Sequence, residues 1–328
     1  MTSVASPALT LATPIRGARI VGIGAARPSK IVTAAALVAP FGKTVEWLHE
    51  RTGIRQLARL AKGEDLASLA AASAQRALAD AGVDIAAVDV ILVATCSGSP
   101  VGQPALSAVL AEQLGARAVA SDVNAACAGF CYALSTAGAL IGSGSAQTVL
   151  VVGAEQMSVM IDPADLGTSI LFADGAGAVV VQASAEGQFG IGPTAWSSDG
   201  ENRGVLEIPD GETHLRMAGQ QVFRWAVDEV HKVASLAIAR AGLTAADIDV
   251  FVPHQANLRI VDAIRRKLRI SDAVIATDVA DSGNTSAASI PLALSRLRQA
   301  GQTRGGQLAL LTGFGAGLSI AAQVVVLP

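Results

Sequence analysis

Apolar residues fall into two patterns along this chain. Short apolar runs bounded by glycine or polar residues occur at 178–181 and 308–311, and such runs are typical of strands buried on both faces of a sheet. From about residue 126 to residue 141 the residues are small, apolar and spaced for a helix buried on nearly every side. Alternating strands and helices of this kind predict an α/β fold.

An internal repeat predicts two copies of one folding unit. Residues 77–90 and 237–250 are identical at seven of fourteen positions, at an offset of 160 residues. Each segment has the pattern of a helix end, a glycine stop, a short loop and an apolar strand. The offset is too long for a solenoid, whose period is about 20–50 residues. We therefore expect two pseudo-symmetric halves, residues 1–185 and 186–328, which meet at the polar stretch 183–188.

The composition limits the class of protein. Of the 328 residues 51% are hydrophobic but only 3% aromatic, so the core must consist of Ala, Val, Leu and Ile. No apolar run reaches the ~18–20 residues that span a bilayer, and the first residues lack the pattern of a signal peptide. Three cysteines, an odd number, argue against a disulfide framework. We expect a cytoplasmic protein with no membrane contact.

Charge and histidine spacing exclude further classes. A net charge of −3 gives no reason to expect nucleic acid as a partner. The four histidines, at positions 49, 214, 231 and 254, form no group with the spacing of metal ligands. We therefore expect no metal and no bound cofactor.

Cys127 is the candidate nucleophile. It stands where a short buried strand meets the helix expected from residue 126. Unpaired N–H groups and the helix dipole at such a position lower a thiol pKa from ~8.5 into the range ~3.5–7.5. A free cysteine is more often a small buried hydrophobic residue, and Cys96 and Cys131 are interpreted in that way.

Polar clusters in the second half of the chain strengthen this interpretation. His254 ends an apolar strand that runs into a helix, and Asn284 lies in a turn before another helix. The glycine-rich stretch 312–317 is interpreted as a hinge after the strand at 308–311. Ligands of α/β sheets commonly bind at strand ends, so these groups and Cys127 predict one site.

These segments closely resemble the β-ketoacyl-acyl carrier protein synthase III family, within the thiolase-like condensing enzymes. The matching stretches run in family order from about residue 18 to the C-terminus; they are 51–55, 124–130, 172–178, 254–260, 283–289 and 313–317. The resemblance implies a thiolase-like five-layered α/β/α/β/α fold, a homodimer, and an active site between the two halves.

The resemblance also implies a mechanism. The Cys127 thiolate takes an acyl group from acyl-coenzyme A or an acyl-carrier protein, with the backbone N–H groups of Cys127 and Ala316 as oxyanion donors. A malonyl-carrier protein then loses carbon dioxide, and His254 and Asn284 donate hydrogen bonds to the resulting enolate. Attack of the enolate on the acyl group forms a carbon–carbon bond and a β-ketoacyl product.

Further positions follow from the same resemblance. Trp47 and Arg51 match the nucleotide end of a coenzyme A site, although Trp47 also fits an ordinary core position. The full set of implied substrate positions is Trp47, Arg51, Gln103, Leu166, Gly219, Phe223, Asn257 and Phe314. The positions that match a docking site for an acidic acyl carrier protein are Arg224, Arg259, Arg266 and Lys267. A basic helix of this kind is also common as a plain solvated face.

Two substitutions depart from the family pattern. Leu166 replaces an arginine that stacks on the adenine of coenzyme A. Gln103 replaces a bulky apolar residue that reaches the partner subunit's acyl pocket. Together they favour a specialised paralogue that primes a polyketide or another secondary metabolite.

Three other functions remain as alternatives. The first is an acyltransferase that passes the Cys127 acyl group to an alcohol, amine or carrier thiol, which does not need both His254 and Asn284. The second is a non-catalytic partner subunit. The third is a nucleotide-binding oxidoreductase, suggested by Gly22 and Gly24, but the third glycine of that fingerprint is missing and the segment is interpreted as a turn at a strand end.

Overall fold

Two five-stranded sheets form the frame of the molecule in a computed structural model, which describes residues 16–98 and 103–328. The first sheet, in spatial order, is β1 (Ala18–Ala26), β7 (Asp174–Ala183), β6 (Thr148–Gln156), β4 (Val90–Ala94) and β5 (Val119–Val123). The second is β12 (Val274–Ile275), β11 (Val250–Pro253), β13 (Leu308–Gly315), β14 (Ser319–Val326) and β8 (Ala195–Ser198). The predicted boundary at 185/186 lies in the connection between β7 and β8.

The two sheets have the same topology. In the first, β5, β4 and β6 are parallel, and β7 and β1 continue the sheet antiparallel. In the second, β12, β11 and β13 are parallel, followed by antiparallel β14 and β8. The repeated segments 77–90 and 237–250 occupy equivalent places, from the helix before β4 and from the helix before β11. The predicted pseudo-symmetry is confirmed.

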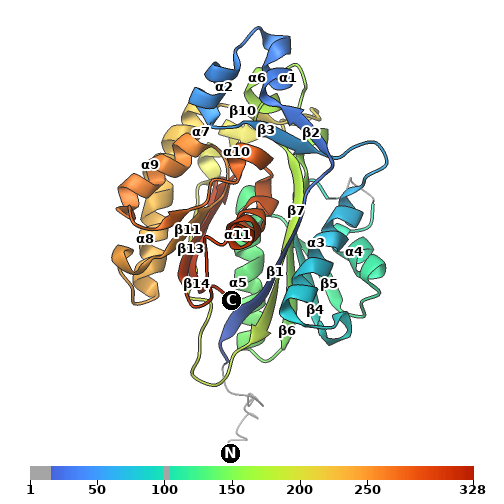
Figure 1. Ribbon diagram of the computed structural model, residues 1–328, viewed down its shortest axis with the longest axis vertical. Coiled ribbons are helices and arrows are strands. Elements are labelled where there is room, and N and C mark those ends of the chain that lie inside the picture. Colours follow the sequence, from blue (N-terminus) through green and yellow to red (C-terminus); the bar gives the residue numbers. More distant parts are fainter. Residues whose placement is uncertain (1–15, 99–102) are drawn as a thin grey trace, which may run out of the picture.

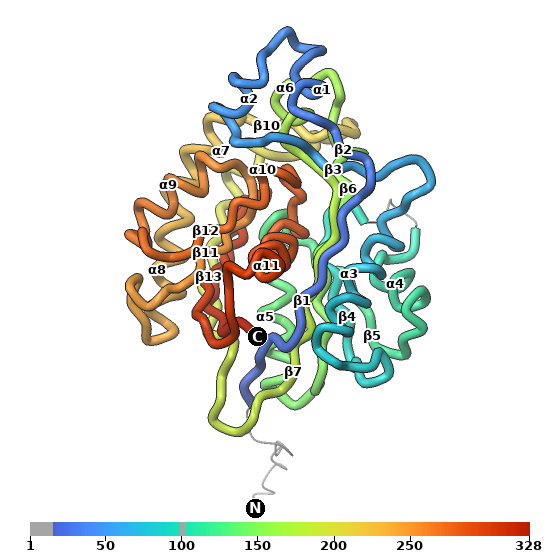
Figure 2. The backbone as a smooth tube through the Cα atoms, in the orientation of Figure 1, coloured from blue at the N-terminus to red at the C-terminus, as the bar shows by residue number. Residues whose placement is uncertain are grey.

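Helices complete five layers (Figures 1 and 2). The outer layer on the first sheet contains α3 (Leu66–Ala81) and α4 (Leu106–Leu114), and the outer layer on the second contains α8 (His231–Arg240) and α9 (Leu258–Leu268). Between the sheets lie α5 (Gly129–Gly142) and α11 (Ser289–Gln299). The α/β/α/β/α prediction is therefore correct.

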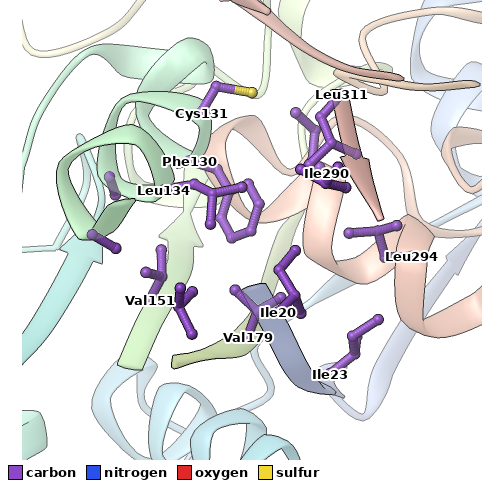
Figure 3. Packing of buried hydrophobic residues seen from close by; sticks show 14 of the residues in the cluster. Ile20, Ile23, Phe130, Cys131, Leu134, Val151, Val179, Ile290, Leu294 and Leu311 are labelled. Atoms are coloured by element: carbon purple, nitrogen blue, oxygen red, sulfur yellow. The ribbon is translucent and has the colours of Figure 1, made fainter. Parts of the chain in front are cut away.

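The middle layer shows why these residues form a buried helix. Phe130, Leu134, Ala137 and Ile141 of α5 are fully buried, and they pack between strands of both sheets. Figure 3 shows Phe130 and Leu134 facing Ile290 of α11 and the strands of the first sheet. Small residues let two helices and two sheets approach closely, so the core needs few aromatic rings.

The remaining elements lie outside the two sheets. β2 pairs with β3, β9 pairs with β10, and α1, α2 and α6 gather at the top of Figure 1. Their bounds are β2 Lys30–Thr33, α1 Ala34–Val38, α2 Val45–Thr52, β3 Gln56–Arg59, α6 Leu166–Ser169, β9 Leu206–Glu207, β10 Arg216–Met217, α7 Gly219–Trp225 and α10 Val279–Ser282. Short 3-10 helices include Ala126–Ala128 and Ser286–Ala288, and a π-helix covers Ala226–Val230. No helix within residues 16–98 and 103–328 is long and apolar enough to cross a membrane.

Two glycine-rich segments were interpreted wrongly from the sequence. Gly22 and Gly24 lie within β1, where a Cβ would stand 2.4 and 2.2 Å from backbone oxygens of α3. Residues 312–315 are the second half of β13, paired with β14, and do not form a hinge. Glycine is required in both strands because neighbouring backbone lies against them.

Candidate active site

One cavity of about 600 Å³ brings together residues from both halves of the chain. Cys127, His254 and Asn284 line it, together with Phe314 and Gly315 of β13. The three polar residues are 6%, 1% and 5% exposed, so the site lies deep in the molecule. Another hollow, of about 710 Å³ beside the start of β1 and the end of α8, contains none of the three.

The backbone before Cys127 holds the thiol in place. Cys127 lies in the 3-10 helix Ala126–Ala128, between β5 and α5, so the strand–helix junction was predicted correctly. The expected burial of the strand was wrong, because β5 is exposed or half-buried along its length. Ala126 has a φ of 45°, a conformation that costs a non-glycine residue free energy, and its N–H donates to the Asn124 side chain at 3.2 Å. On the other side, a Cβ at Gly315 would stand 2.7 Å from Cys127 Cβ. Cys127 is therefore positioned between the strained turn at Ala126 and Gly315 of β13.

Burial shifts the pKa of Cys127 in the direction opposite to the one expected. Desolvation raises the pKa of the thiol to about 12, the nearby Ser286 hydroxyl opposes this shift, and the charge of Glu155 adds to it. The prediction of a lowered pKa was wrong for this state of the enzyme, because the helix-end effect acts on a thiol that has lost its water. Cys131, one turn along α5, has its pKa raised to about 12 by burial as well.

His254 is a neutral ring whose position is fixed by two neighbouring side chains. Its Nδ1 lies 2.7 Å from Ser289 Oγ, and the Phe314 ring packs edge-on with centroids 5.2 Å apart. Burial lowers the pKa of His254 to about 3, while a contact with the Ser286 backbone opposes this shift. The ring is therefore uncharged at neutral pH and serves as a hydrogen-bonding group.

Asn284 has one side of its amide fixed. The N–H of Ser286 donates to its Oδ1 at 2.9 Å, so its NH₂ group remains for the cavity. The preceding Gly283 has a φ of 77°, and a Cβ there would stand 2.3 Å from Leu57 Cδ2. This glycine is thus needed for the turn that presents Asn284.

A buried carboxylate beside the site was missed in the sequence. Glu155 is fully buried near the end of β6, and Ser286 Oγ donates to its Oε1 at 2.9 Å. Burial raises the pKa of this carboxyl, against the hydrogen bonds that it accepts. Glu155 follows the apolar run 149–154, so an ionisable residue at the end of a buried strand was the available signal.

Most of the expected substrate positions lie in this cavity. Those among its lining are Trp47, Arg51, Gly219, Phe223, Asn257 and Phe314. Leu166 instead packs with Trp47 in a neighbouring apolar cluster, and Gln103 is exposed on the surface. Ala316 is not among the lining residues, although its neighbour Gly315 is. Trp47 has the cations Lys43 and Arg51 at 5.6 and 5.7 Å from its ring.

The expected docking residues flank the opening on α7 and α9. Arg224 and Arg259 line the cavity, and Arg259 lies 5.6 Å from the Phe223 ring. Arg266 is 74% exposed, with Asp262 3.9 Å away. Lys267 forms an ion pair with Asp228 at 3.0 Å, which lowers the pKa of that carboxyl. All four residues are exposed, and Lys267 has the closest ion pair among them.

No group of three or more His, Cys, Asp or Glu side chains suited to a metal ion occurs in the described ranges. The chemistry that the cavity offers comes from the thiol, the imidazole and the amide.

Two family models match the chain. Residues 121–200 match 3-oxoacyl-[acyl-carrier-protein] synthase III, and residues 238–327 match the C-terminal part of the same family. The first match contains Cys127, and the second contains both His254 and Asn284.

Curated relatives and solved structures agree with these matches. The chain is 41% identical to β-ketoacyl-[acyl-carrier-protein] synthase III 1 of Streptomyces coelicolor, over 95% of the chain and 96% of the relative. It is 43% identical to the Mycobacteroides abscessus synthase III, over 94% of each. The priming β-ketosynthase of the R1128 polyketide pathway superposes with a TM-score of 0.93 at 43% identity, covering 98% of this chain and 99% of that one. The Pseudomonas aeruginosa PAO1 3-oxoacyl-(acyl carrier protein) synthase III gives 0.90 at 37%, covering 95% and 99%.

Proposed function

The chain belongs to the 3-oxoacyl-[acyl-carrier-protein] synthase III family of decarboxylating condensing enzymes, and we propose that Cys127, His254 and Asn284 carry out its condensation. The observation that supports this assignment is the convergence of a thiol and two neutral hydrogen-bond groups on one deep cavity. The relatives include β-ketoacyl-[acyl-carrier-protein] synthases III and the priming β-ketosynthase of a polyketide pathway. The family therefore sets the reaction, and the cavity would select the starter group.

In the first half-reaction Cys127 attacks an acyl thioester. A bond forms between its sulfur and the acyl carbon, and the bond from that carbon to the donor sulfur breaks. The tetrahedral intermediate carries an oxyanion, for which the N–H groups of Cys127 and Ala316 are the proposed donors. Gly315 supports the pairing because it brings this end of β13 against Cys127.

In the second half-reaction a malonyl thioester binds over the acyl-cysteine and loses carbon dioxide. The enolate oxygen takes hydrogen bonds from the Asn284 NH₂ group and from His254 Nε2. A Ser289 hydroxyl that donates to Nδ1 selects the tautomer with its hydrogen on Nε2. Neutral donors suit this step, because they stabilise the new charge without pairing with the malonyl carboxylate that must leave.

Acyl transfer without condensation is the second candidate. It uses Cys127 and the oxyanion donors, but gives no role to the fixed Asn284 amide. Analysis of the products formed from an acyl donor and a malonyl-carrier protein distinguishes the two, because only condensation releases carbon dioxide.

We propose that the cavity binds the pantetheine arm shared by coenzyme A and carrier proteins. The arm would pass Phe223 and Asn257, with Trp47 and its two cations at the phosphate-bearing end. Leu166 offers no charge or ring for an adenine, which favours a carrier-bound donor. We also propose a cytoplasmic location, which fractionation of the source cells tests.

An acyl carrier protein would dock on the exposed cations of α7 and α9. We predict that Arg266→Glu lowers kcat/KM for malonyl-carrier protein about tenfold, because the reversed charge slows association with an acidic partner. The rate with a malonyl thioester of N-acetylcysteamine should not change, since Arg266 lies outside the cavity lining. The matched control is Arg304→Glu, the same charge reversal at an exposed arginine that lies outside α7 and α9. Equal losses in both variants would argue against a docking site on α9.

A homodimer would form through the edge of the first sheet. Within the described residues β5 pairs with β4 on one side only, and Val119 at its start is 71% exposed. Such an edge invites pairing with a second copy about a twofold axis. Sedimentation should give about twice the 33.0 kDa chain mass, and Val119→Asp should shift the protein towards monomer. Leu236→Asp, at an exposed position of α8, is the control and should leave the dimer intact. A monomeric wild-type protein would contradict the proposal.

A further inference from the structure

Gln255 is a fully buried glutamine that none of the proposed steps uses. It follows His254 directly, just after the end of β11. Its Oε1 accepts a hydrogen bond from the Val279 N–H at 3.1 Å, and its Nε2 donates to the carbonyl oxygens of Pro253 at 2.8 Å and Ala276 at 3.3 Å. An amide removed from water is costly unless it is bonded in this way, so its place beside the site calls for a reason.

The two carbonyl oxygens belong to neighbouring strands of the second sheet. Pro253 is the last residue of β11, and Ala276 follows β12 directly. The backbone pairing of these two strands ends at Phe251 and Ile275, so the Gln255 amide connects them beyond their last pair. The glutamine therefore fixes the end of the sheet that carries the imidazole.

The third hydrogen bond reaches the turn that presents Asn284. Val279 is the first residue of α10, a helix of four residues, and its carbonyl oxygen accepts from the Gly283 N–H at 3.0 Å. Gly283 immediately precedes Asn284. One short helix thus connects the Gln255 side chain to the catalytic amide.

The backbone of Gln255 makes a second connection, on the other side of Asn284. Its N–H donates to Ser289 Oγ at 3.3 Å, and this oxygen lies 2.7 Å from His254 Nδ1. Ser289 is the first residue of α11, which follows the Asn284 turn. The segment that carries the amide is therefore tied at both ends to the residue after His254.

The backbones of the two enolate donors are held by different halves of the chain. The His254 N–H donates to the Thr312 carbonyl of β13, in the second half. The Asn284 N–H donates to the Leu171 carbonyl, and the Asn284 carbonyl accepts from the Ala173 N–H, both in the first half. Movement of one half against the other would therefore change the spacing of the two side chains.

We propose that the Gln255 side chain fixes the spacing between His254 Nε2 and the Asn284 NH₂ group, so that one enolate oxygen receives both hydrogen bonds. Gln255 is not among the residues that line the cavity, so it is a positioning residue that acts through the two donors. Donors fixed in advance stabilise a developing charge best, and a misplacement of about 1 Å can cost about 100-fold in rate. This inference rests on the proposed roles of His254 and Asn284.

The test measures two rates in one variant. They are carbon dioxide release from the malonyl thioester of N-acetylcysteamine and acylation of Cys127 by the acetyl thioester. Gln255→Met keeps the length of the side chain and removes its three hydrogen bonds. We expect kcat for carbon dioxide release to fall about tenfold, less than for a lost donor, with KM unchanged and acylation within about twofold of wild type. Equal losses in the two rates would overturn the proposal, because a glutamine that serves only the fold affects both.

A double-mutant cycle with His254→Ala separates positioning from an independent effect. In that background one donor remains, so the spacing no longer matters, and adding Gln255→Met should lower carbon dioxide release less than about twofold further. A further loss as large as the one in wild type would contradict a role through the donors. Unchanged carbon dioxide release in both His254→Ala and Asn284→Asp would instead overturn the proposed function.

Gln323→Met is the matched control. Gln323 is another fully buried glutamine, in β14, whose Oε1 accepts a hydrogen bond from Thr194 at 2.8 Å, and it is absent from the cavity lining. Both rates should stay near wild type in this variant. If Gln255→Met does not fold, Gln255→Asn takes its place: it keeps the amide but is one methylene too short to make all three hydrogen bonds. It should lower carbon dioxide release and spare acylation, and a uniform loss would again overturn the proposal.

Discussion

Replacement of Cys127 by alanine is expected to lower the condensation rate about 10⁴-fold or more, as removal of a nucleophile does in other covalent mechanisms. The reaction has no substitute for this group, because the acyl chain must be held as a thioester while the second substrate binds. Steady-state product formation measures the loss, and intact mass should show no acyl adduct on the variant.

Cys131→Ala is a closely matched control. Cys131 is the same residue type, is fully buried, lies one turn along the same segment, and has its pKa raised to about 12 by the same cause. Its sulfur faces Gly313 and is absent from the cavity lining. This variant should retain most of the activity. Comparable losses in the two variants would mean that the cysteines matter for packing and would remove the assignment of Cys127.

The second large effect is expected at the enolate donors. His254→Ala and Asn284→Asp should each lower decarboxylation of the malonyl thioester about 10²–10³-fold, the usual effect of losing one preorganised donor to a developing oxyanion. Asn284→Asp is the sharper change, because the carboxylate still accepts the Ser286 N–H but can no longer donate. Carbon dioxide release measures the step.

Acylation of Cys127 provides the internal control for these variants. It should stay within about tenfold of wild type, since the acyl oxyanion depends on other donors. A neutral ring also predicts that no activity is lost through His254 protonation between pH 8 and pH 5, because its pKa is lowered to about 3. Variants that stop acylation and leave decarboxylation intact would reverse the proposed division of roles.

Much of the fold could be predicted because it is encoded locally. The repeat at 77–90 and 237–250 marks equivalent helix–strand connections, and the apolar segment after Cys127 forms a helix buried in the middle layer. His254 and Asn284 could be placed at strand or turn ends from their neighbours alone. That they meet Cys127 in one cavity depends on the pairing of the two halves.

The errors and omissions involve long-range packing. Burial raises the pKa of Cys127, and Gly315 of β13 lies against this residue although nearly 190 residues separate the two in the chain. The hydrogen bond from Ser286 Oγ to Glu155 Oε1 joins residues that are 131 positions apart, so no local pattern reveals it. Gly22 and Gly24 suggested a turn, but they are glycines because α3 leaves no room for a Cβ. Local pattern predicts elements, whereas contact between distant segments determines what each site residue does.

The central claim, that the Cys127 acyl group is extended by decarboxylative condensation, is tested most directly by product mass. Wild-type enzyme would be mixed with malonyl-carrier protein and a panel of acyl donors on coenzyme A and on carrier protein. We predict a carrier-bound β-ketoacyl product with one carbon dioxide released for each acyl group consumed. An acylated Cys127 with no chain extension from any donor, while the malonyl group stays intact, would contradict this function.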